Sequence, residues 1–127
     1  MLNKTNSCIK TLEVKCLQPD CISDSTLYVL GKLPHIQRIH VSGASACTLD
    51  INSAAIMKLL LCNVYASRSL RSLFLGYIVF SDIHSNDNNK EDPVEFLECK
   101  ISPHYNVIKL ASNYDFVSLS IADRNYQ

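Results

Sequence analysis

The sequence predicts an α/β fold, a repeat solenoid with short parallel strands on its concave face and helices on its convex face. A six-residue pattern, apolar-x-x-apolar-x-apolar, recurs five times, and helix-like stretches separate the copies. The copies begin at residues 9, 36, 70, 94 and 116, so the steps between them are 27, 34, 24 and 22 residues. Recurrence at intervals of this length is typical of solenoids, in which each repeat buries its apolar edge only against its neighbours. Because solenoids are mostly binding scaffolds, the pattern favours a binding function.

Each copy of the pattern is expected to form a strand. Apolar residues at the fourth and sixth positions alternate with polar ones, which is the period of a half-buried strand. The first two copies, KTLEVK and QRIHVS, place polar residues on the open face. The expected strands are 9–14, 36–41, 70–75, 94–99 and 116–121.

The stretches between the strands are expected to be helical. They are 25–33, 54–66 and 102–112. Ser23 or Asp24 can cap the first helix, and Pro34 follows its end. Asn52 or Ser53 can accept hydrogen bonds from the free amides that begin the second helix. Strand, helix and strand joined by short loops imply parallel strands with the helices on the other side.

The chain of 127 residues is long enough for one domain, with an exposed loop at 81–93. This loop is rich in Asn and Asp and contains one apolar residue, Ile83. It lacks the ligand spacing and the central Gly of an EF-hand, so a solvated loop is favoured over a calcium site.

The chain resembles a leucine-rich repeat protein of the ribonuclease-inhibitor-like type. The copies that carry the resemblance are IKTLEV, IQRIHV, LRSLFL, VEFLEC and FVSLSI. The resemblance implies a protein-binding domain that is the ligand-sensing or regulatory part of a larger receptor or adaptor, such as a NOD-like innate immune receptor in signalling. The chain departs from the family where Asn or Cys usually follows each strand, because other residues stand there: Leu17, Ala44, Ile78, Ser102 and Arg124.

Composition excludes several classes of partner. Basic and acidic residues balance at 12 each, without a Lys/Arg block, so we expect neither a nucleic acid nor a membrane surface as partner. No stretch approaches the roughly 18 apolar residues that cross a bilayer. The N-terminus lacks a signal-like apolar stretch, and several of the six cysteines occupy apolar positions. We therefore expect reduced, structural thiols in a cytoplasmic protein.

The sequence contains no recognisable catalytic constellation. Its three glycines, at 31, 43 and 76, are too far apart for a phosphate-cradling loop. Cys and His do not form the close pairs of a zinc site. We therefore expect no enzyme activity, no metal and no cofactor. A compact α/β enzyme fragment with scattered catalytic residues and a structural assembly domain remain as alternatives.

The outward positions of the strands are the expected binding site. Phe74 and Phe96 would lie on adjacent strands about 4.8 Å apart and form an apolar patch flanked by charged side chains. The candidate binding residues are Arg38, His40, Arg71, Phe74, Glu95, Phe96 and Glu98. The expected partners are a protein ligand on the concave face and neighbouring repeats or domains of a larger chain.

Overall fold

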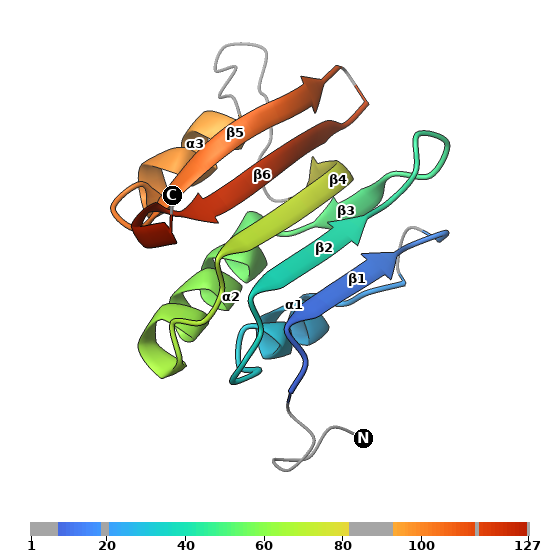
Figure 1. The fold of residues 1–127 in the computed structure, drawn as a ribbon. Helices are drawn as coiled ribbons and strands as arrows, with labels where there is room; N and C mark the ends of the chain where they lie inside the picture. The colour runs from blue at the N-terminus through green and yellow to red at the C-terminus, as the bar shows by residue number, and fades with distance from the viewer. Residues whose placement is uncertain (1–7, 19–20, 82–92, 114, 127) are drawn as a thin grey trace.

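The computed structural model describes residues 8–18, 21–81, 93–113 and 115–126. These residues form one sheet that is covered on a single side by helices (Figure 1). In chain order the elements are β1 (Thr11–Lys15), α1 (Asp24–Leu30), β2 (Arg38–Ser42), β3 (Leu49–Ile51), α2 (Ser53–Ala66), β4 (Ser72–Phe80), α3 (Pro93–Ile101), β5 (Tyr105–Ser112), β6 (Val117–Asp123) and a final 3₁₀ turn (Arg124–Tyr126).

The strand order is β1-β2-β4-β6-β5, and β3 pairs with the second half of β4. Strands β1, β2 and β4 are parallel, but β6 is antiparallel to β4 and to β5. The predicted solenoid of parallel strands is therefore wrong. Only residues 113–116 join β5 to β6, and a connection this short permits a hairpin but no crossover helix.

The fourth expected strand is a helix in the structure, and the third expected helix is a strand. Residues 94–99 belong to α3, and 105–112 form β5. The side chains that α3 buries are Val94, Leu97 and Ile101, which are spaced by three and four residues as on one face of a helix. The first half of the six-residue pattern, apolar-x-x-apolar, fits this period as well as that of a strand.

The other predicted elements are confirmed in outline. Strands 9–14, 36–41, 70–75 and 116–121 all overlap observed strands, and both of the first two helices form. Ser23 caps α1 by accepting a hydrogen bond from the Thr26 amide at 3.2 Å. Asn52 caps α2 by accepting one from the Ala54 amide at 2.8 Å. Of the expected loop 81–93, Ser81 lies in a turn and Pro93 begins α3, while 82–92 lie outside the described residues.

The hydrophobic core lies between the sheet and the helices. The strands contribute side chains that are at most 1% exposed, among them Ile39, Val41, Leu73 and Ile121. The helices cover them with Leu27, Ile56, Leu59, Leu60 and Leu97. Burial of these aliphatic groups provides the main stabilising free energy of the fold.

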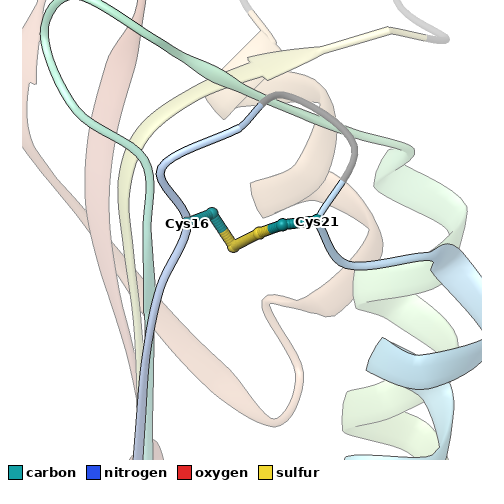
Figure 2. Close-up of a disulfide and its surroundings, with 2 residues drawn as sticks. All are labelled: Cys16 and Cys21. Carbon is teal, nitrogen blue, oxygen red and sulfur yellow. A yellow bond between two sulfur atoms is a disulfide. The ribbon is translucent and has the colours of Figure 1, made fainter.

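Two of the six cysteines are joined in a disulfide. Cys16 follows β1 and Cys21 precedes α1, so the bond closes the connection between these elements (Figure 2). Cys8, Cys47, Cys62 and Cys99 are free thiols. The expectation of reduced thiols is wrong for the joined pair. Cys99, which occupies the last apolar position of the fourth copy of the pattern, is not a core residue, because it lies on the exposed side of α3.

Alkylation of the denatured, unreduced protein is therefore expected to label four of the six cysteines, and peptide mapping should recover Cys16 and Cys21 linked. Prior reduction should raise the number of labelled sites to six. It should also lower the free energy of unfolding by about 2 kcal/mol, since a closed loop of this length constrains the unfolded chain. Complete labelling without a reductant would contradict the disulfide.

Candidate binding face of the sheet

Within the described part of the chain, no helix covers one face of the sheet. In Figure 1, α1, α2 and α3 all lie behind the strands, and the face toward the viewer is open. The burial of β2 follows this division, because Ile39 and Val41 are buried toward the helices while Arg38 is exposed and His40 is half-buried. The pairing registers extend the open face across the sheet as two rows of side chains. The first row consists of Thr11, Arg38, Ser72, Ala122 and Asn106. The second row consists of Glu13, His40, Phe74, Ser120 and Ile108.

His40 is the centre of a contact group on this face. Its imidazole packs edge-on against the Phe74 ring with 4.2 Å between the centroids. On its other side, Nδ1 lies 4.0 Å from a carboxylate oxygen of Glu13. Because these side chains are directly opposite one another on β1, β2 and β4, they form a cross-strand triad in which the His40 ring lies between the Glu13 carboxylate and the Phe74 ring.

Gly76 makes room for the Phe74 ring. A Cβ atom placed on Gly76 would lie 2.8 Å from Cε2 of Phe74 and 3.0 Å from the Cβ of Ser42. The ring therefore leans along β4 across the space that a side chain at position 76 would fill. Glycine here is explained by this close approach.

A second aromatic pair lies farther along the same strands. The rings of Tyr77, on β4, and Phe116, before β6, are tilted with 4.7 Å between centroids. The pairing of β4 with β6 is irregular between Leu75 and Ile78, and the Tyr77 amide donates to the hydroxyl of Ser118 at 3.0 Å. The sequence does not predict either ring on this face, because Tyr77 lies in an apolar run and Phe116 occupies a core position of the repeat pattern.

The structure brings together only some of the candidate residues. Arg38, His40 and Phe74 share the open face, and Arg71 is exposed immediately before β4. Glu95, Phe96 and Glu98 lie on α3, on the covered side of the sheet. The expected patch of Phe74 with Phe96 is wrong, since residue 96 is helical, and its ring instead has Lys100 Nζ 5.7 Å from its centroid.

A buried polar cluster of Asp123, Arg68 and Tyr105 connects the hairpin of β5 and β6 with α2 and the residues that follow it. Asp123 is 1% exposed and lies 3.9 Å from Nε of Arg68. The Tyr105 hydroxyl donates to the Leu60 carbonyl at 3.3 Å. Burial, with the nearby Asp123 charge, raises the pKa of Tyr105 to about 12. Tyr105 is therefore a neutral donor, and the cluster is structural because it lies away from the open face.

A hollow of about 560 Å³ lies between the first turns of α1 and α2. Its lining includes the Tyr28 ring, the Asp24 carboxylate and the Lys58 amine, but no Cys or His.

Within the described ranges, no three His, Cys, Asp or Glu side chains lie close enough together to hold a metal ion. No helix in the same ranges is long and apolar enough to cross a membrane. The expectation that the chain is not an enzyme remains a prediction.

No family model, curated protein or solved structure matches the chain.

Proposed function

We propose that this domain is a protein-binding module that holds its partner on the open face of the sheet. The proposal is carried by two pairs of rings, His40 with Phe74 and Tyr77 with Phe116, on the open face of the sheet. Arg38 lies at the edge of this aromatic group. Protein interfaces are enriched in aromatic residues and Arg, and their strongest contacts combine an apolar centre with a polar rim.

The polar side chains around the rings fit the same function. Glu13, Lys15 and Arg38 supply both signs of charge at the β1 side, and Ser72, Ser120 and Asn106 supply hydrogen-bonding groups elsewhere on the face. Mixed charge without a basic excess favours a protein partner over a nucleic acid.

Two narrower expectations lose their basis in this structure. The larger receptor or adaptor, and the innate immune receptor in particular, were implied by the resemblance to a solenoid family, so neither forms part of this proposal. The cytoplasmic location relied on reduced thiols, so the alkylation measurement above also bears on that location.

Site-specific photo-crosslinking tests the proposed face. A benzophenone amino acid is placed at Ser72 on the open face or, in a matched variant, at Glu98 on α3. Each variant is irradiated in a lysate of the cells that produce the protein. A protein crosslinked from Ser72, absent from Glu98 and lost when Arg38→Glu is added, is the expected result. Crosslinks from Glu98 alone would move the partner to the helical side and overturn the proposal.

A further inference from the structure

We propose that a second copy of this chain pairs with the outer edge of β1, so that the two sheets join in antiparallel orientation across a two-fold axis. The pairing goes beyond the proposed function, because it uses the edge of the sheet rather than the aromatic rings of the open face. Three observations carry it: the unpaired side of β1, the order of the charges along that strand and the contrast with the opposite edge.

The outer side of β1 is open to another strand. β1 lies at one end of the strand order and, among the described residues, pairs only with β2 (Figure 1). The Lys10 carbonyl accepts a hydrogen bond from the Arg38 amide at 3.0 Å, and the Cys16 amide donates to the Ser42 carbonyl at 2.8 Å. Since successive residues of a strand direct their backbone groups to opposite sides, the even-numbered residues bond to β2 and residues 11, 13 and 15 direct theirs outward. Such a row of unpaired amides and carbonyls is a template for an extended chain.

The order of the charges along this edge favours a second copy as that chain. Glu13 and Lys15 are both exposed and lie two residues apart on the open face. In an antiparallel pair the outward-directed residues face one another, and an alignment of Glu13 with Glu13, or of Lys15 with Lys15, is unfavourable because like charges are then opposite. When Glu13 instead faces Lys15 of the second copy, the two-fold axis repeats the contact, and two pairs of opposite charge form.

The same alignment supplies an apolar contact at the axis. It places Val14 opposite Val14 of the second copy, in a position without mutual hydrogen bonds, where antiparallel strands approach most closely. Val14 is only partly buried within one chain, where it packs against the core. Pairing would therefore remove more of its apolar surface from water, on the side of the sheet away from the charges.

The opposite edge of the sheet does not have this complementarity. β5 ends the strand order there, and residues 105–112 include a single charged side chain, Lys109. A register shift between Lys109 and Ala111 interrupts its pairing, and bulges of this kind hinder association between sheet edges. Backbone bonds alone would accept an extended strand of any protein at either edge. The matching order of charges on β1 is what favours a second copy there.

Sedimentation equilibrium of the wild type, Glu13→Lys, Lys15→Glu and the double variant tests the proposal. Exposed thiols are first alkylated without a reductant, so that no intermolecular disulfide forms and the bond between Cys16 and Cys21 stays closed. The wild type should show a reversible monomer–dimer equilibrium between micromolar and millimolar concentration, since one strand pair is a small interface. Each single reversal places like charges opposite one another at both contacts, and should raise the dissociation constant about tenfold or more.

The restored charge pairs are the decisive part of the experiment. The double variant, and an equal mixture of the two single variants, again place opposite charges across the axis, so both should associate within about threefold of wild type. Glu98→Lys on α3 is the matched control, because it changes the net charge as Glu13→Lys does but lies away from the edge. Its dissociation constant should equal that of wild type. Melting temperatures within a few degrees of wild type would show that the exposed substitutions leave the fold intact.

Three outcomes would overturn the pairing. The first is a wild type that remains monomeric at millimolar concentration. The second is a double variant that associates as weakly as the single ones, because residues 13 and 15 then do not face each other. The third is a dimer with the same dissociation constant in all variants, because its interface then lies elsewhere. The crosslink from Ser72 tests the open face separately, so none of these outcomes decides the proposed function.

Discussion

Replacement of Asn63 by alanine is expected to lower the free energy of unfolding by about 3 kcal/mol and the melting temperature by about 10 °C. Asn63 is fully buried near the end of α2, where its side chain contacts two other elements. Its Oδ1 accepts a hydrogen bond from the Leu70 amide at 2.8 Å, and its Nδ2 donates to the Gly31 carbonyl at 3.1 Å. One side chain thereby joins the end of α1, the end of α2 and the approach to β4.

The size of the effect follows from what alanine leaves behind. The Leu70 amide and the Gly31 carbonyl would each lose a partner in a buried environment, and each unsatisfied group costs about 1–3 kcal/mol. Nδ2 also lies within hydrogen-bonding distance of the hydroxyls of Ser67 and Ser69, at 3.4 and 3.2 Å. These hydroxyls are nearer the surface and can turn to water.

Urea unfolding followed by circular dichroism measures the change. The matched control is Asn52→Ala, the same substitution at the α2 cap, where one bond at 2.8 Å is lost and a typical cap loss of about 1 kcal/mol is expected. Equal losses for the two variants would show that Asn63 does not connect the elements as described.

The contrast between Asn52 and Asn63 also shows how far the sequence could predict this fold. The sequence predicts a cap at Asn52 or Ser53, because a cap acts on the next few residues, and the structure places it at Asn52. Asn63 was missed, because it lies within the helical apolar run of 54–66, and only the fold brings Gly31 and Leu70 to it. Local signals predicted the first two helices and four of the strands for the same reason.

Residues 94–112 could not be predicted in this way. The spacing of Val94 and Leu97 fits one turn of a helix as well as the start of the repeat pattern, so the pattern wrongly predicts a strand where α3 lies. A strand at this position also leads to the wrong strand direction, since an alternation of strands and helices implies parallel strands, whereas β6 is antiparallel to its neighbours. The position of β6 between β4 and β5 depends on long-range pairing, which no short window reveals.

The same distinction holds for the residues of the candidate site: those in correctly predicted strands were expected there, and the others were not. Arg38, His40 and Phe74 were foreseen on one face because alternation within a true strand fixes which side chains point outward. Phe96 was misplaced with its helix. Tyr77 was missed because a register shift breaks the alternation there. Its exposure depends on a backbone conformation that the sequence does not display.

Gly31→Ala is expected to be as destabilising as the loss of Asn63, by about 3 kcal/mol, for a steric reason. Gly31 follows α1 with φ of −67° and ψ of −17°, a helical conformation that alanine adopts readily. On conformational grounds alone, alanine would stabilise the protein by about 0.4–1 kcal/mol. A Cβ atom at this position, however, would overlap the Leu59 carbonyl oxygen and lie 3.1 Å from its carbon. Backbone in the middle of α2 cannot turn aside, so the two helices must separate.

Gly76→Ala is the matched control, because its Cβ would meet the end of the Phe74 ring, which can rotate away, and the Cβ of Ser42 at 3.0 Å, which needs to move only slightly. We expect it to change stability by less than about 1 kcal/mol. A neutral or stabilising Gly31→Ala would contradict the close helix contact. The double variant of Gly31→Ala with Asn63→Ala should cost less than the two single losses combined, because displacement of α1 already weakens the bond from Asn63 to the Gly31 carbonyl. Strict additivity would mean that the helix contact and the asparagine stabilise this junction independently.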